Sequence, residues 1–104
     1  MTWVVRYLLS AKQDLKGIHE YISNTLLAPE TAKNQVKRIK ASADGLNFLP
    51  LRHQLVQYEP WRSQGVRMMM VDKYAIIYHP NEATGVVSVI RILHGSRDIG
   101  EHLT

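Results

Sequence analysis

The sequence predicts an α+β fold with the element order β-α-α-β-β-β, in which a helix hairpin packs on a small, mainly antiparallel sheet. Two observations lead to this fold. Apolar residues recur at helical spacing in two successive stretches of the N-terminal half. Three short runs of β-branched and aromatic residues then follow, separated by turn residues. A chain of 104 residues is expected to form one domain, residues 1–104.

The first elements are a strand and a helix. Residues 3–9 (WVVRYLL) have the composition of a strand. A helix is expected over residues 11–27, with Ser10 as its N-cap and Asp14 complementing the helix dipole. Gly17 weakens this helix and is interpreted as a point of close helix packing.

A second helix is expected to begin at Pro29, because proline suits the first turn of a helix. It has the most regular amphipathic pattern in the sequence, formed by Ala32, Val36, Ile39, Ala43 and Leu46. A basic stripe of Lys33, Lys37 and Lys40 runs beside the apolar one. This stripe fits a solvated face better than a nucleic-acid surface. The short connection at residues 27–28 makes the two helices an antiparallel hairpin.

The C-terminal half predicts three strands, at residues 66–71, 74–79 and 86–93. Short turns join them, so they form an antiparallel meander, and the N-terminal strand must pair with one of its edges. The last strand is almost entirely apolar or β-branched, which is typical of a strand inside a sheet. Strict alternation along it puts Arg91 on one face with Val87, Val89 and Leu93.

A long loop at residues 50–64 separates the helices from the meander. It carries a basic and aromatic set that could bind the target or a nucleic acid: Arg52, His53, Trp61 and Arg62. Alternatively, Trp61 and the nearby Tyr58 cover the edge of the sheet. Both interpretations fit the residue types in this loop.

Composition limits the kinds of chemistry and partner. The net charge of +4 favours an acidic partner, and the absence of cysteine excludes disulfides and thiolate metal sites. The five histidines include no i,i+4 pair, and no carboxylate cluster accompanies them, so neither a metal nor another cofactor is expected. No apolar run is long enough to span a membrane and no signal peptide is recognisable, so a cytoplasmic protein is expected.

Four segments carry a resemblance to a known family. They are AxxDLxxIxxYI at residues 11–22, GVR at 65–67, YxIxY at 74–78 and IRILHGxRD at 90–98. With these segments in this order, the sequence resembles the RelE/ParE superfamily, the toxins of type II toxin–antitoxin modules. The last segment looks like the ParE branch. The resemblance implies growth arrest, neutralisation by an acidic antitoxin in a hetero-oligomer, and a role such as plasmid stabilisation.

The two branches of this superfamily imply different targets. RelE-like members cleave ribosome-bound mRNA, whereas ParE-like members are regarded as poisons of DNA gyrase. The RelE pattern has an arginine after the tyrosine of the penultimate strand, where this chain has Ala75 after Tyr74. It also has a tyrosine near the C-terminus, where this chain has residues 100–103 (GEHL). A ParE-like gyrase poison is therefore expected, with a RelE-like mRNA endoribonuclease as the alternative and an inactive antitoxin-binding relative as a third reading.

If the chain is an enzyme, it is expected to be a metal-independent endoribonuclease. Such a reaction needs a base, an acid and cations near the phosphate. The candidate residues are Arg67, Arg91 and Arg97 for charge and His94 for proton transfer, with His79 and His53 as further histidines. The alternatives are structural: Arg67 and Arg91 pair with Asp98 or Glu59, Arg97 pairs with Asp98, and His94 is a turn residue.

Overall fold

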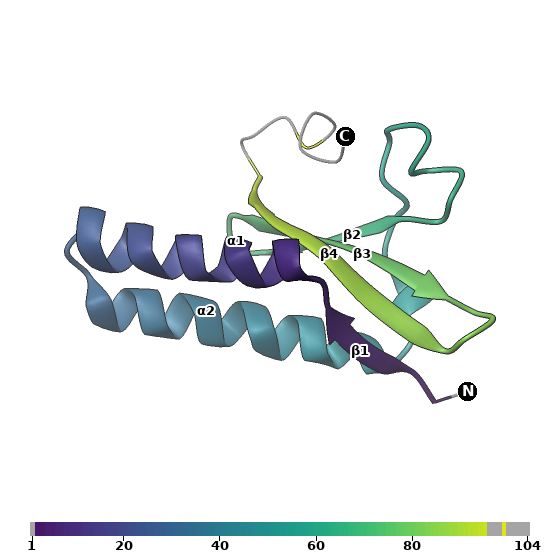
Figure 1. The fold of residues 1–104 in the computed structure, drawn as a ribbon, viewed down its shortest axis with the longest axis horizontal. Coiled ribbons are helices and arrows are strands. Elements are labelled where there is room, and N and C mark those ends of the chain that lie inside the picture. The colour runs from purple at the N-terminus through teal and green to yellow at the C-terminus, as the bar shows by residue number, and fades with distance from the viewer. Residues whose placement is uncertain (1, 96–98, 100–104) are drawn as a thin grey trace.

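The computed structural model describes residues 2–95 and 99 of the chain. Its helices and strands follow the predicted order β-α-α-β-β-β (Figure 1). They are β1 (Val4–Tyr7), α1 (Leu9–Glu20), α2 (Pro29–Asp44), β2 (Arg67–Val71), β3 (Tyr74–Asn81) and β4 (Val86–His94). A π-helical turn, Tyr21–Thr25, continues α1, and two short 3-10 turns, Gly45–Asn47 and Pro50–Arg52, follow α2.

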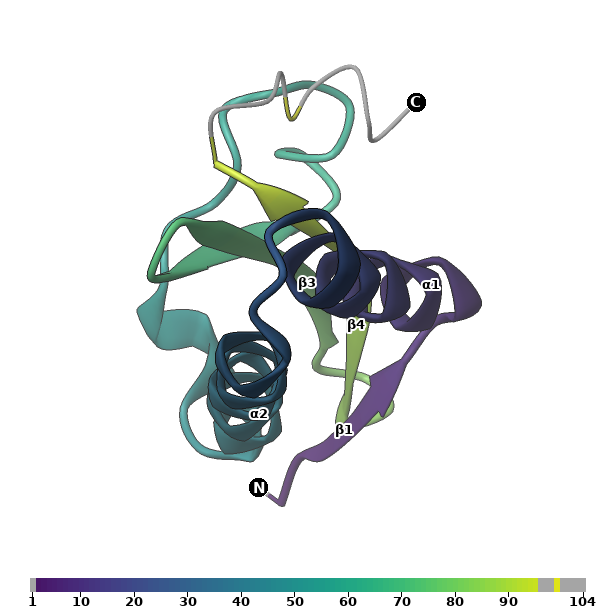
Figure 2. The same ribbon diagram turned by 90° about the vertical axis from the view of Figure 1, so that its left-hand side faces the viewer.

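The four strands form one sheet in the order β1-β4-β3-β2. β1 pairs with β4 in parallel, whereas β4 with β3 and β3 with β2 are antiparallel. This arrangement confirms the predicted meander, the pairing of the N-terminal strand with its edge and the interior position of the last strand. The two helices lie side by side over one face of the sheet, as the view along them shows (Figure 2).

A β-bulge interrupts the pairing of β3 with β4. Ile77 lies opposite Arg91, but the next residue of β3, Tyr78, lies opposite Val89, so Ile90 is left without a partner in the register. An extra residue in one strand shifts the alternation of its side chains by one position. The two ends of β4 therefore follow opposite alternations.

The bulge makes the predicted common face of Arg91 wrong. Val87 and Val89 pack in the main core, under the helices. Leu93 packs in a second cluster on the opposite face of the sheet. The sequence gives no sign of this change, because apolar residues occupy both faces along most of β4.

Two details of α1 differ from the prediction. Ser10 does not cap the helix, since the N-cap is Leu8, and the Ser10 hydroxyl instead donates a hydrogen bond to the carbonyl oxygen of Ile90 on β4. Gly17 is exposed, and a Cβ added there would have no atom within 4 Å outside its own neighbourhood. Its interpretation as a point of close helix packing is therefore wrong.

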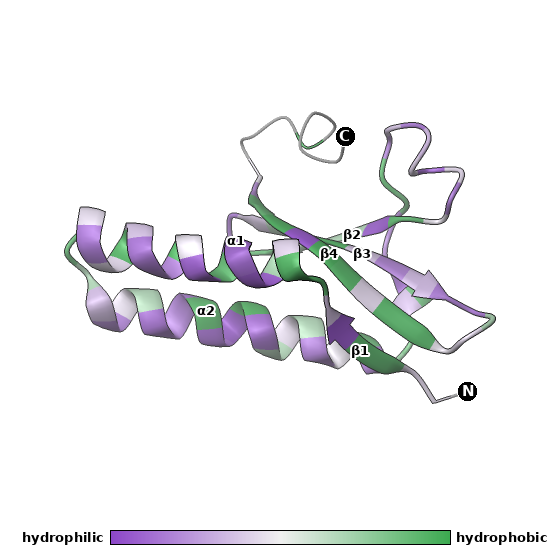
Figure 3. Ribbon diagram, in the orientation of Figure 1, coloured by the Kyte–Doolittle hydropathy of each residue, from purple (hydrophilic) through white to green (hydrophobic). Residues whose placement is uncertain are grey.

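The main core lies between the helix hairpin and the sheet. The predicted apolar stripe of α2 is confirmed: Ala32, Ile39, Ala43 and Leu46 are buried and Val36 is half-buried. The three lysines beside the stripe are exposed. Hydrophobic residues accordingly predominate along β4, and hydrophobic and hydrophilic residues alternate along both helices (Figure 3).

A second apolar cluster covers the other face of the sheet. Its buried members are Val56, Val66, Ala75, Ile77, Leu93 and Ile99. Trp61 is half-buried and packs against this cluster, over the face of the sheet and not its edge, whereas Tyr58 is exposed. Both faces of β3 are therefore buried, and this explains its nearly continuous apolar sequence.

The buried stripe of α2 makes a stability prediction. Ile39 is completely buried, so Ile39→Ala is expected to lower the free energy of unfolding by about 2–5 kcal/mol through lost burial and a cavity. Lys37→Ala, on the exposed flank, is the control and should leave stability nearly unchanged. Urea unfolding followed by circular dichroism measures both variants. Equal destabilisation by the two would mean that the buried face is misassigned.

Candidate functional site

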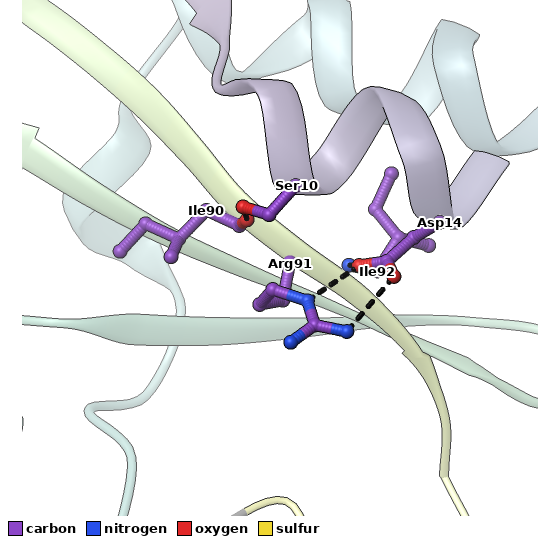
Figure 4. Close-up of polar contacts among 5 residues, drawn as sticks. All are labelled: Ser10, Asp14, Ile90, Arg91 and Ile92. Atoms are coloured by element: carbon purple, nitrogen blue, oxygen red, sulfur yellow. Dashed lines mark hydrogen bonds and ion pairs between the residues drawn. The ribbon is translucent and has the colours of Figure 1, made fainter. Parts of the chain in front are cut away.

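The edge of β4 beyond the end of β1 is covered by side chains of α1 (Figure 4). The Ser10 hydroxyl donates to the carbonyl oxygen of Ile90 at 2.7 Å. One turn further along the helix, Asp14 Oδ2 accepts a hydrogen bond from the backbone N–H of Ile92 at 2.9 Å. These two polar side chains provide the hydrogen bonds that a neighbouring strand would otherwise supply.

The same carboxylate holds Arg91. The Arg91 Nε lies 2.7 Å from Asp14 Oδ2, and its Nη2 lies 2.9 Å from Oδ1, a two-point contact (Figure 4). Both side chains are largely buried, with 27% of Arg91 and 15% of Asp14 exposed. The hydrogen bonds and charge of Asp14 raise the pKa of Arg91. The sequence predicts Asp98 or Glu59 as the partner of Arg91, whereas the structure shows this two-point contact with Asp14.

A cleft of about 560 Å³ opens beside this ion pair, between α1 with its π-helical turn and the adjoining ends of β3 and β4. Its walls include Tyr21, Tyr74 and His94 as well as the pair itself. The rings of Tyr74 and His94 meet edge to face, with centroids 5.5 Å apart. Burial raises the pKa of Tyr74, and the nearby phenol of Tyr21 adds to this. His94 is thus part of an aromatic wall.

The residue after His94 is a glycine because there is no room for a larger side chain at this position. The backbone N–H of Gly95 donates to the carbonyl oxygen of Lys73 at 2.7 Å, which ties the end of β4 to the β2–β3 turn. A Cβ on Gly95 would lie 3.2 Å from that oxygen and 2.9 Å from Met70 Cε. The next candidates in the motif, Arg97 and Asp98, lie outside the described residues.

Arg67 is placed at the other end of the sheet, where it holds the segment after α2. Its Nη1 donates to the carbonyl oxygens of His53 at 2.6 Å and Leu51 at 3.1 Å. The buried Tyr78 hydroxyl donates to the carbonyl oxygen of Pro50 at 2.6 Å. Two side chains of the sheet therefore hold three backbone carbonyls of this turn, those of residues 50, 51 and 53, and its shape depends on them.

The loop arginines also contact backbone. Arg52 donates to the carbonyl oxygens of Phe48 and Leu49. Arg62 Nη1 lies 3.4 Å from the carbonyl oxygen of Val56. Both arginines are exposed, so these contacts leave part of each side chain at the surface. Their predicted role in target binding, like that of His53 and Trp61, stays a prediction.

The structure does not bring the described catalytic candidates together. Arg67 lies opposite Tyr78, whereas His94 lies opposite Tyr74, four residues away along β3. At the rise of a β-strand this separation is about 13 Å. Arg91 turns toward Asp14 at the sheet edge. Among residues 2–95 and 99, no group of three His, Cys, Asp or Glu side chains could hold a metal ion.

A groove of about 580 Å³ between α1 and α2 was not predicted. Leu15 and Val36 contribute apolar lining, and the charged residues of the lining are three lysines and one glutamate: Lys12, Lys16, Lys40 and Glu20. The lysine stripe of α2 was visible in the sequence, but only the pairing of the helices shows that lysines of both line one groove. This groove combines apolar surface with positive charge.

The fold and this site define a class of small α+β domains in which a helix hairpin covers a four-stranded mixed sheet. The sequence model for "ParE toxin of type II toxin-antitoxin system, parDE" matches residues 5–99. This chain therefore belongs to the ParE toxin family of type II toxin–antitoxin systems. No curated protein matches it in sequence. Within residues 2–95 and 99, no helix has the length and apolarity needed to cross a membrane.

Solved structures share the RelE/ParE-like fold. The chromosomal ParDE system from P. aeruginosa has a chain with a TM-score of 0.73 at 19% identity, covering 89% of this chain and 96% of that one. A chain of the RelBE2 toxin–antitoxin complex from Mycobacterium tuberculosis has a TM-score of 0.66 at 19% identity, and the match covers 90% of this chain and 99% of that one. A chain of the archaeal RelE–RelB complex from Pyrococcus horikoshii OT3 has a TM-score of 0.56 at 16% identity, and the match covers 93% of this chain and 99% of that one.

The Asp14 carboxylate is expected to matter for stability. Asp14→Ala leaves the Arg91 guanidinium and the Ile92 N–H without this acceptor, at a cost of about 1–3 kcal/mol. Asp14→Asn keeps one acceptor oxygen and should cost less. Glu82→Ala, in the exposed β3–β4 turn, is the control. Chemical denaturation measures all three, and wild-type stability of Asp14→Ala would contradict this role.

The environment of His53 predicts a pH dependence. Burial lowers its pKa from 6.5, and the charge of Arg52 adds to this. Well above pH 6.5, the histidine is neutral in both the folded and the unfolded protein. As the pH falls below 6.5, the unfolded chain takes up the proton first, so stability decreases until the folded state also protonates. His53→Gln should therefore lose less stability than the wild type between about pH 7.5 and 5.5. Urea unfolding at both pH values measures the loss of stability, and an equal loss in the wild type and in His53→Gln would contradict this prediction.

Proposed function

We propose that this chain arrests growth in the cytoplasm by poisoning DNA gyrase, and that an acidic antitoxin neutralises it. The observation that carries the choice of target is the separation, among the described residues, of the groups that RNA cleavage would need. A base, an acid and phosphate-binding cations must surround one phosphate. Instead, Arg67 binds two backbone carbonyls, Arg91 binds Asp14, and His94 lies against Tyr74.

The position that carries an arginine in the RelE pattern supports the same choice. This position is Ala75, which is completely buried in the second cluster. A cation there would lie among apolar side chains rather than at a surface open to RNA. The ParE-like reading needs no such group, because a poison acts through contacts with a protein target. Arg97 and His94 remain the candidates for those contacts.

The groove between α1 and α2 supports an acidic antitoxin. Its lysines complement an acidic segment, and its apolar residues offer area for burial. A disordered segment that folds on binding can cover such a groove. The structural neighbours come from toxin–antitoxin complexes. We therefore place the antitoxin on the helix hairpin.

The target is tested by comparing two purified systems. With DNA gyrase, the toxin is expected to inhibit supercoiling and trap double-strand breaks, and its induction in cells should trigger the SOS response. With programmed ribosomes, mRNA 5′ ends should stay unchanged. Addition of the antitoxin should abolish the gyrase effect.

The alternative makes the opposite demand on the same assays. A codon-specific cut in ribosomal mRNA, with gyrase unaffected, would overturn the gyrase assignment in favour of the RelE-like activity. In that case His94→Ala should lower the cleavage rate by roughly 10²–10⁴-fold if His94 is the acid or base.

A further inference from the structure

Gly17 lies at the cleft beside the Asp14–Arg91 pair and has no packing reason to be glycine. It is inside α1, where glycine destabilises a helix relative to alanine. A Cβ there would have no non-neighbouring atom within 4 Å, and the position is exposed. The backbone is ordinary helix, so no special conformation requires it either. Glycine here leaves the mouth of the cleft open.

The lining of the cleft suits an aromatic group with polar edges. Tyr21, which is 55% exposed, together with Tyr74 and His94 offers ring surface. Gln13 and the edges of the ion pair offer hydrogen-bonding groups. The volume of about 560 Å³ accommodates a large side chain and part of the peptide that carries it.

The charges of the cleft favour a peptide over a nucleic acid. Among residues 2–95 and 99, no lysine lines it, and the charge of Arg91 is matched by the Asp14 carboxylate at two points. Phosphate backbones are bound mainly through unmatched positive charge, which the described part of this wall does not supply. The groove on the other side of α1, with its three lysines, differs in this respect.

We propose that the cleft binds an aromatic side chain of the antitoxin, as a second anchor next to the basic groove. This inference rests on the proposed antitoxin complex. The groove and the cleft lie on opposite sides of α1, and exposed residues such as Lys16 and Gly17 lie between them. A chain bound in the groove reaches the cleft by crossing α1, where Gly17 allows close approach of its backbone. Aromatic side chains in such pockets often dominate binding energy.

The test uses the purified toxin with the acidic protein encoded by the adjoining open reading frame. Gly17→Leu fills the mouth of the cleft and should weaken binding by roughly tenfold or more, without lowering the melting temperature. Asn34→Leu is the matched control, because it adds the same side chain at an exposed position of α2 that lines neither cavity. It should bind as the wild type does.

A second variant guards against local effects of the new leucine. Tyr21→Ala removes an exposed ring from the wall and should also weaken binding, with little change in thermal stability. Wild-type antitoxin affinity of both variants would overturn this inference, and loss of gyrase poisoning alone would assign the cleft to the target instead. If the wild-type chain binds no antitoxin, the proposed function fails, and this inference with it.

Discussion

The position of the helices on the sheet depends on the contacts that the Asp14 carboxylate of α1 makes with β4. β1 pairs with β4 only as far as Val89, so the edge of β4 beyond it needs other partners. Ser10 and Asp14 lie four residues apart on α1, a rise of about 6 Å, and Ile90 and Ile92 lie two apart on β4, a rise of about 6.6 Å. The two spacings agree only when the helix runs along the strand. α1 is thereby fixed on the sheet, and α2, which returns antiparallel to it, completes the main core.

The bulge in β4 belongs to the same arrangement. It lies at Ile90, where α1 replaces β1 as the neighbour of the strand. By shifting the alternation, it places Ile92 in the main core while Arg91 reaches around the edge to Asp14. A buried guanidinium without a carboxylate would be costly, so bulge, helix position and ion pair stabilise one another.

The elements of the fold could be predicted from sequence because their signals are local. The stripe around Ile39 has helical spacing, and the C-terminal strands are separated by turn residues. The bulge could not be predicted, since β4 is apolar on both faces. The partner of Arg91 could not be predicted for a different reason: Asp14 has an ordinary interpretation near a helix N-terminus, and it lies 77 residues from Arg91 in the sequence. Arg67 was predicted as a catalytic candidate from its charge, but only the fold shows that it binds backbone carbonyls.

One leucine before α2 and one after it combine a strained backbone conformation with an exposed apolar side chain. Leu27 and Leu49 have positive φ angles of 54° and 47°, and 81% and 59% of them are exposed. A left-handed conformation costs a residue with a Cβ roughly 1–2 kcal/mol, and glycine or asparagine would adopt it more readily. Around Leu49, the side chains of Arg52, Arg67 and Tyr78 hold the backbone in place. Neither leucine belongs to the main core or to the second apolar cluster, so burial of the side chain does not offset this cost at either position.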